Sequence, residues 1–232
     1  MIGSIPKISF VTSAMSDRSV RKRESILEAA TELFLTLEYA GTSMADIAAA
    51  AAVSKQTVYK HFSDKETLFR EVALGSVGEV GAAFQAEVAA TAEASDVPLA
   101  LRELARSYLI AVMNPVLLRR RQLVLREAGR FPDLARKYHE SGPRRTIQVL
   151  ATAFDRLSER RELLVDDPLL AATQFAFLVV GEPLDTAMFR GGRRRTRREL
   201  NSLADAAVEV FLAAYRRKRE SPRLHGLANP NS

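Results

Sequence analysis

The sequence predicts an all-α protein. Beyond residue 66, apolar residues recur at helical spacing almost throughout, and no part of the chain shows the sustained alternation with hairpin turns that is typical of β-sheets. Residues 43–65 carry the patterns of two short helices joined by a tight turn. We therefore expect a small N-terminal helical domain followed by a larger helical domain.

The first helix is expected over about Ser19–Leu37. Its apolar residues follow the i, i+3, i+4, i+7, i+8 rule, and they are Ile26, Ala29, Ala30, Leu33, Phe34 and Leu37. A basic arm precedes or opens this helix, made of Arg18, Arg21, Lys22 and Arg23. This arm could reach the backbone or minor groove of DNA, and a solvated charged terminus explains it equally well.

The second helix begins after Thr42 and Ser43, which are both good N-cap residues. Asp46 lies in its first turn, where the helix dipole favours a negative charge. The inner stripe of this helix is Ile47, Ala48 and Ala51. Residues 52–54 form the connection, and Ser54 can cap the third helix. Ser63 is expected to cap the fourth.

The third helix has an unusual outward face. Val58 and Phe62 point inward at i, i+4 spacing, which leaves Lys55, Gln56, Thr57, Tyr59, Lys60 and His61 outside. A solvated helix face is usually rich in Glu and Lys, but residues 55–63 contain no carboxylate. These groups suit phosphate oxygens and base edges, so the pattern predicts a helix that lies in a DNA groove. The alternative is a small helical corner with an ordinary polar face.

Composition limits the function without defining it. The chain has 232 residues, a net charge of +6 and no Cys, so it has no disulfide framework, thiolate metal site or Cys nucleophile. The charge excess does not itself indicate DNA binding, because Arg18–Lys65 has a net charge of only +1 whereas Arg190–Arg223 has +7. No stretch reaches the roughly 20 apolar residues of a membrane span, and the first 15 residues make a poor signal peptide.

The rest of the chain predicts seven further segments. We expect helices over about 64–92, 98–113, 115–129, a short piece after Pro132, 143–163, 167–189 and 196–218. Pro183 should kink the sixth of these segments. Residues 191–195 should form a loop, and residues 1–17 and 220–232 should be disordered tails.

The last two helices carry stripes of small and apolar residues. The stripe of the last helix is Leu200, Leu203, Ala204, Ala207, Val210, Phe211 and Ala214, and that of the helix before it is Leu169, Ala172, Ala176, Val179 and Val180. These stripes could pair with a second copy of the chain, or could simply face their own core.

Residues 20–72 resemble the N-terminal domain of the TetR family of bacterial transcriptional regulators. The resemblance rests on residues 26–30, 33–34, 42–48, 53–62 and 65–68. It implies a helix-turn-helix domain over 18–66 with its motif at about 43–62. It also implies that Lys55, Gln56, Thr57 and Lys60 face the major groove, that Tyr59, His61 and Lys65 hold phosphates, and that Thr42 or Ser43 adds a backbone contact.

Two positions depart from the family pattern. The family commonly has Gly just after the first helix and in the turn of the motif, where this chain has Glu38 and Ala52. Glycine is favoured where φ is positive, and other residues cost about 1 kcal/mol or more there. We therefore expect the turn of the motif to be strained or locally different.

Residues 127–134, followed by Gly142-Pro143, resemble the C-terminal domain of the AefR-like branch of this family. This resemblance implies a helical ligand-binding and dimerisation domain over 67–219, with a pocket between its middle helices. Candidate lining residues are Tyr108, Met113, Arg126, Phe131, Tyr138, Gln148, Phe154 and Phe175. Ordinary core packing is the alternative for each of them.

The sequence thus predicts a cytoplasmic, sequence-specific DNA-binding transcriptional regulator. The resemblance further implies a homodimer on a palindromic double-stranded operator, released by a small-molecule effector. Repression is what the family implies. No cofactor, metal, membrane or catalytic residue is expected, because the three His residues are scattered and H-E-x-x-H, P-loop and G-x-S-x-G motifs are missing. The alternatives are an all-helical small-molecule binder or enzyme without DNA function, and a helical protein-interaction module.

Overall fold

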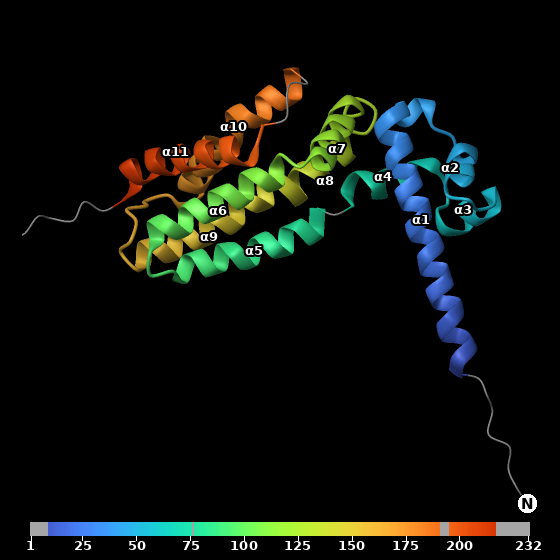
Figure 1. Ribbon diagram of the computed structural model, residues 1–232, viewed down its shortest axis with the longest axis horizontal. Helices are drawn as coiled ribbons and strands as arrows, with labels where there is room; N and C mark the ends of the chain where they lie inside the picture. Colours follow the sequence, from blue (N-terminus) through green and yellow to red (C-terminus); the bar gives the residue numbers. More distant parts are fainter. Residues whose placement is uncertain (1–8, 76, 191–194, 217–232) are drawn as a thin grey trace, which may run out of the picture. The chain divides into compact units, whose positions relative to one another are not determined.

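The computed structural model describes residues 9–75, 77–190 and 195–216, and every regular element in those ranges is a helix (Figure 1). The predicted all-α class is therefore confirmed. The chain divides into two compact units, residues 1–82 with 112–145 and residues 83–111 with 146–232. None of the helices in the described ranges has the length and apolar character that a membrane span requires.

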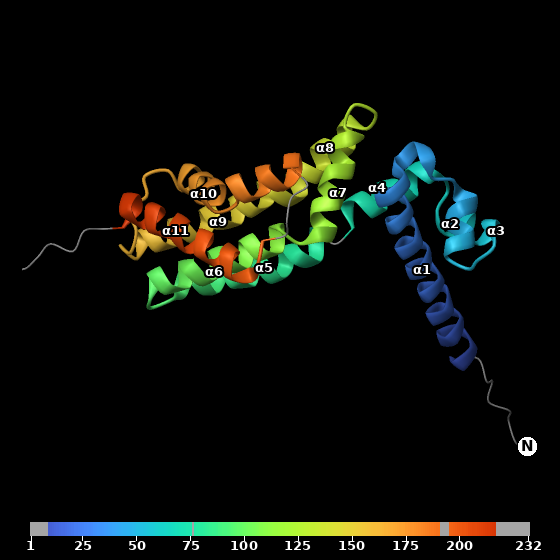
Figure 2. The same cartoon turned by 45° about the horizontal axis from the view of Figure 1, so that its top comes forward.

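The first unit joins the start of the chain to a segment from its middle. Its helices are α1 (Ser9–Gly41), α2 (Met44–Ala50), α3 (Lys55–His61), α4 (Lys65–Leu74), α7 (Pro115–Arg126) and α8 (Pro132–His139), followed by a π-helical turn (Glu140–Arg144). The short helices α2 and α3 pack on each other and on α1 (Figure 2). This unit is therefore larger than a helix-turn-helix alone, because α7 and α8 complete its core.

Helix α1 differs from the prediction at both ends. It begins at Ser9, so residues 9–17, expected to be disordered, are helical, whereas residues 1–8 and 217–232 lie outside the described ranges. Of its predicted inner face, Ile26, Ala30 and Phe34 are fully buried, whereas Leu37 is 46% exposed. Its helical geometry breaks at Glu38, where φ is 62° and ψ is −178°, before a last turn ending at Gly41.

An aromatic cluster forms the centre of the first unit. Phe34 and Tyr39 from α1 contact Phe69 of α4, with ring centroids 5.2 and 5.0 Å away. Phe131, at the start of α8, packs on Tyr39 at 5.0 Å and on Phe69 at 5.4 Å. Edge-to-face and tilted aromatic pairs stabilise a core beyond the area they bury. Helices α1, α4 and α8 are therefore held together by one continuous apolar contact.

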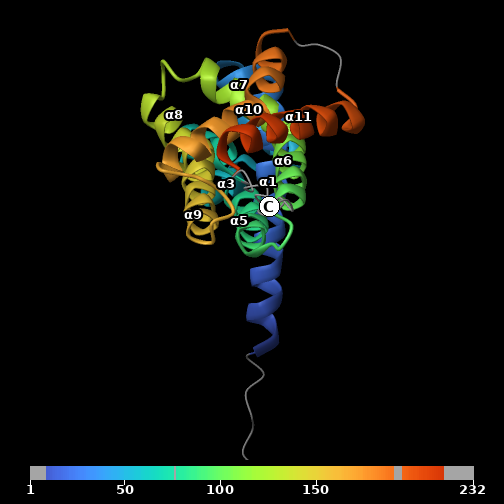
Figure 3. The same cartoon turned by 90° about the vertical axis from the view of Figure 1, so that its left-hand side faces the viewer.

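The second unit contains α5 (Val77–Glu93), apart from its first residues, α6 (Val97–Val112), α9 (Arg145–Glu159), α10 (Pro168–Arg190) and α11 (Arg197–Tyr215). Helices α5, α6 and α9 run alongside one another (Figure 3). Phe154, Phe175 and Phe211 are fully buried and meet with centroid distances of 5.1–5.4 Å, which joins α9, α10 and α11. A two-bond ion pair from Arg106 to Asp205, at 2.7 and 2.6 Å, ties α6 to α11.

Helices α10 and α11 pack against each other, and most of the stripes expected to pair with a second copy face this unit's own core. The buried members are Ala172, Ala176, Val179, Val180, Leu200, Ala204, Ala207 and Phe211. Other apolar residues lie on the exposed side, namely Leu169, Leu170, Phe177, Leu178, Leu203 and Val210. Periodicity could not separate the two faces because both are apolar.

Several helix boundaries differ from the prediction. The helix expected over 64–92 is two helices, since α4 ends at Leu74 and Gly75 takes extended angles, with φ −58° and ψ 143°. Helix α7 ends at Arg126 rather than at Gly129, and α9 begins at Arg145 rather than at Pro143. Pro143 lies instead in the π-helical turn, because a proline has no N–H to donate to an α-helical ladder.

Candidate nucleic-acid interface

Helix α2 is closed at its start by a capping box. The Asp46 N–H donates to Ser43 Oγ at 3.1 Å, and the Ser43 N–H donates back to Asp46 Oδ2 at 3.1 Å. Hydrogen bonds from Ser43 lower the pKa of the Asp46 carboxyl. Ile47 and Ala48 are buried as predicted, so the cap and the inner face together fix the helix.

The turn between α2 and α3 is a Schellman motif. The Val53 N–H donates to the Ala48 carbonyl at 3.0 Å, and the Ala52 N–H donates to the Ala49 carbonyl at 3.1 Å. In this motif the residue after the helix adopts the left-handed conformation, and Ala52 has φ 53°. The strain expected from an alanine at a position where the family has glycine is thus present in the backbone.

Helix α3 starts at an N-cap serine, as predicted. Ser54 Oγ accepts from the Thr57 N–H at 3.1 Å. Val58 and Phe62 are 0% and 2% exposed, which anchors the inner side of the helix. The Arg23 guanidinium lies 5.1 Å from the Phe62 ring centroid and also pairs with Glu71. Val58, Phe62 and Arg23 therefore determine how α3 packs on the rest of its unit.

The outer side of α3 carries the predicted contact residues. Lys55, Gln56, Tyr59 and Lys60 are exposed, with Tyr59 at 45%. Thr57 is half-buried, and its hydroxyl lies 2.8 Å from Ser54 Oγ. Cationic, amide and phenol groups on one helix face can meet phosphates and the major-groove edges of bases.

His61 is the titratable group at the end of this face. Its side chain is half-buried, and its pKa lies below the usual value because of burial and the nearby positive charges of Lys60, Arg23 and Lys22. The neutral imidazole can still donate one ring N–H to a phosphate oxygen. A phosphate at this position would favour the protonated form, so contact with DNA would be linked to pH.

Three residues expected to contact DNA form hydrogen bonds with other groups of the protein. Thr42 is 2% exposed, and its hydroxyl donates to the Glu38 carbonyl at 2.8 Å. Lys65 Nζ donates to the carbonyls of Tyr39 and Thr42 at 2.7 Å each, and burial lowers its pKa. The Ser43 hydroxyl donates to Asp46 Oδ2 at 2.6 Å. Thr42 and Lys65 stabilise the α1–α2 corner, which we define as residues 38–42. Ser43 stabilises the start of α2, which follows this corner.

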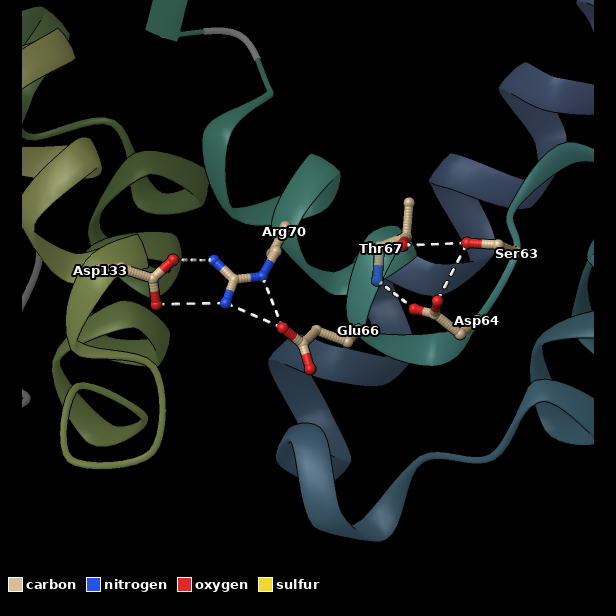
Figure 4. Close-up of polar contacts among 6 residues, drawn as sticks. All are labelled: Ser63, Asp64, Glu66, Thr67, Arg70 and Asp133. Carbon is tan, nitrogen blue, oxygen red and sulfur yellow. Dashed lines mark hydrogen bonds and ion pairs between the residues drawn. The ribbon is translucent and has the colours of Figure 1, made fainter.

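The cap of α4 differs from the prediction. Asp64, not Ser63, is its N-cap, since Asp64 Oδ1 accepts from the Thr67 N–H at 2.7 Å (Figure 4). Ser63 supports this cap by donating to Asp64 Oδ2 at 3.0 Å. These hydrogen bonds lower the pKa of Asp64. Aspartate is a strong N-cap residue, and the two adjacent candidates could not be separated from sequence.

The basic arm is partly occupied by contacts within the protein. Arg21 pairs with Asp17 one turn away, and Arg23 pairs with Glu71 of α4. Arg18 and Lys22 are exposed on α1. Only part of the arm therefore remains a candidate for contact with nucleic acid.

The eight candidate pocket residues fall into both units. Met113, Arg126, Phe131 and Tyr138 belong to the first unit, and Tyr108, Gln148, Phe154 and Phe175 belong to the second. Phe131, Phe154 and Phe175 lie inside aromatic cores, which is the alternative that the sequence left open. Among the described residues, no group of three His, Cys, Asp or Glu side chains is arranged to hold a metal ion.

Sequence reasoning singled out residues 127–134 but missed what they contact. Asp133 Oδ2 and Oδ1 accept from Arg70 Nη1 and Nη2 at 2.6 and 3.2 Å, and Arg70 also contacts Glu66 (Figure 4). The Arg130 guanidinium lies 4.5 Å from the Tyr39 ring centroid. No local pattern pairs residues so far apart in the chain, so only the folded structure reveals these contacts.

Helices α1, α2 and α3 pack on one another, and the two short helices α2 and α3 are joined by a tight turn. This arrangement defines a helix-turn-helix transcriptional regulator. Comparison with known proteins supports this class of protein. Residues 26–72 match the family described as bacterial regulatory proteins, tetR family, and residues 99–217 match the AefR-like transcriptional repressor C-terminal domain. The chain belongs to the TetR family.

Similar solved structures extend over most of the chain. A TetR-family transcriptional regulator from Mesorhizobium loti is 41% identical, with a TM-score of 0.80, over 86% of this chain and 99% of the other. The flavonoid-responsive regulator FrrA is 34% identical, with a TM-score of 0.67, over 86% of this chain and 99% of the other.

Curated relatives match only about a quarter of the chain, at 22–28% of its length. The HTH-type transcriptional regulator AcrR of Shigella flexneri is 37% identical over 68 residues, which is 28% of this chain and 32% of that protein. The chain thus aligns with about a third of this relative's length.

Proposed function

We propose that this protein is a cytoplasmic, ligand-released repressor that binds a palindromic DNA operator as a homodimer. The observation that carries the proposal is the outer face of α3, where Lys55, Gln56, Tyr59 and Lys60 are exposed and no carboxylate is present. In a two-fold dimer, two copies of α3 would enter successive major grooves about one helical turn apart.

An apolar surface on the second unit supports dimerisation. Leu170, Phe177 and Leu178 of α10 are 50%, 65% and 42% exposed, and Val210 of α11 is 57% exposed. Helical spacing places Leu170, Phe177 and Leu178 along one side of α10. A contiguous apolar patch on a protein surface commonly marks a protein interface. We infer that this surface, defined as Leu170, Phe177, Leu178, Leu203 and Val210, pairs with its copy.

Release by an effector requires a difference in affinity. A ligand shifts the protein away from the DNA-binding conformation only by the factor by which it binds the other conformation better. The similarity to a regulator named as flavonoid-responsive makes flavonoids a reasonable first class of test compounds. The expected result is that such a compound weakens operator binding without unfolding the protein.

The test begins with selection of binding sites from random double-stranded DNA, followed by fluorescence anisotropy across a salt series. Wild-type protein should bind a palindromic site far more tightly than a scrambled one, with one dimer per site. Lys55→Ala and Tyr59→Ala should weaken this binding with the fold intact. Lys137→Ala, which removes an exposed charge on α8, is the matched control. Equal weak binding to both DNAs would favour a helical small-molecule binder, enzyme or interaction module without DNA function.

A further inference from the structure

The segment that links α7 to α8 contacts both helices that flank the helix-turn-helix. We call residues 126–134 the bridge segment. On the α1 side, Arg126 Nη1 lies 3.2 Å from Glu38 Oε1, and the Arg130 guanidinium lies 4.5 Å from the Tyr39 ring centroid. Both contacts are made to the α1–α2 corner, where the chain leaves α1 and enters the helix-turn-helix.

The same segment also contacts α4, which leaves the helix-turn-helix. Asp133 accepts two hydrogen bonds from Arg70 (Figure 4), and the Arg70 guanidinium lies 5.4 Å from the Phe131 ring centroid. Phe131 packs between Tyr39 of α1 and Phe69 of α4. The bridge segment therefore holds the entry and the exit of the helix-turn-helix at once.

The α1–α2 corner is strained where the bridge segment reaches it. Glu38 has φ 62° and ψ −178°, a region that is almost exclusive to glycine. A non-glycine residue persists there only when surrounding contacts determine its conformation. Its carboxylate pairs with Arg126, and both side chains are about half exposed, at 48% and 49%. Such an exposed ion pair adds little to stability, so stability alone does not account for a glutamate at this position.

We propose, building on the function proposed above, that the bridge segment sets the orientation of the helix-turn-helix and that Glu38 and Arg126 are positioning residues for operator binding. Helices α2 and α3 are connected to their unit through α1 and α4. Fixing both connections before DNA arrives reduces the ordering cost of binding. Loss of the Glu38–Arg126 contact leaves the corner less restricted, and operator affinity falls although no DNA contact has been removed.

Variants at Glu38 separate this role from a purely structural one. Glu38→Gly removes the strain and the ion pair together, so the unfolding midpoint should rise while operator affinity falls by about fivefold or more, the low end of coupling between distinct sites. Glu38→Ala keeps the strain and loses the ion pair, so operator affinity should fall while the unfolding midpoint changes little. A structural role alone would move stability and affinity in the same direction. Removal of a negative charge would by itself strengthen DNA binding, so weaker binding would be due to the lost positioning of the helix-turn-helix and not to the change in charge.

Two controls sharpen the experiment. Glu32 pairs with Arg119 at 3.8 Å, which is a second contact between α1 and α7 outside the corner, and Glu32→Ala should not weaken operator binding. The exchange Glu38→Arg with Arg126→Glu should recover most of the affinity that each single change loses. The salt dependence of binding should stay constant for all these variants, because no phosphate contact is lost.

The outcomes distinguish this inference from the proposed function. Wild-type protein that selects no DNA sequence would overturn both. Wild-type protein that binds its selected operator, with Glu38→Gly and Glu38→Ala binding equally well, would overturn the inference alone. Weaker binding by both variants, recovered in the exchange, would support it.

Discussion

Replacing Ala52 with glycine should stabilise the protein. Ala52 follows α2 with φ 53°, in the left-handed position of a Schellman motif, where glycine has no side chain to clash. An L-residue with a side chain costs roughly 1–2 kcal/mol in this conformation. The Ala52 side chain is exposed, so its removal sacrifices no core contact. Glycine lowers the free energy of unfolding by roughly 0.5–1 kcal/mol relative to alanine, because it loses more backbone freedom on folding.

The central values of these two ranges leave a net gain in the free energy of unfolding of about 0.75 kcal/mol. For a chain of this size, about 1 kcal/mol raises the unfolding midpoint by roughly 2–4 °C. Thermal unfolding followed by circular dichroism measures the shift. Arg161→Gly is the matched positive control, since Arg161 has φ 60° in a second Schellman motif after α9. Ala49→Gly removes the same methyl group from within α2, where glycine is unfavourable, and should lower the midpoint.

One result would refute this reasoning. If Ala52→Gly unfolds at or below the wild-type midpoint while Arg161→Gly is stabilised, the backbone at residue 52 is not strained in solution. The same variant should leave the helix-turn-helix intact, because the hydrogen bonds of the turn are made by backbone atoms that glycine retains. We therefore expect its operator affinity to equal or exceed that of the wild type.

Three further predictions follow from the same structure. Ser54→Ala removes the N-cap of α3 and should lower the free energy of unfolding by about 1 kcal/mol, measured by urea denaturation, whereas Ser63→Ala should be nearly neutral because Asp64 caps α4. Operator affinity should rise as pH falls from 8 to below the usual histidine pKa of about 6.5, because nearby phosphate would raise the lowered pKa of His61 and binding would take up a proton. Anisotropy across that range should show no such rise for His61→Gln, and a persistent rise would exclude His61 as its source. Phe177→Asp should yield monomers in sedimentation equilibrium and weaken operator binding, whereas Leu125→Asp, on α7 and also exposed, should leave the dimer intact.

Local rules were sufficient for most of the helix-turn-helix. Ile47, Val58 and Phe62 are buried where periodicity placed them, and Ser54 caps α3 as its residue type indicated. Such features depend on neighbours within four residues, which sequence alone reveals. The special conformation of Glu38 and Ala52 was indicated only by the resemblance to a family that commonly has glycine at these positions, and both residues have positive φ in the structure.

Only the tertiary structure decided which side chains remain available at the surface. Lys65 has the charge of a phosphate ligand, yet its ammonium group is bonded to carbonyls of the α1–α2 corner. On α10, Phe175 and Phe177 are equally apolar, but one is fully buried and the other is 65% exposed.

The bridge segment shows the same division between sequence and fold. Its residues stood out as a motif, but their partners Glu38, Tyr39 and Arg70 lie far away in the chain. The sequence by itself determined the inner faces of α2 and α3 and the cap of α3, since these depend on neighbours within a few residues. The fold alone determined which cations and aromatic rings are used inside the protein, because that depends on contacts between residues that chain order does not bring together.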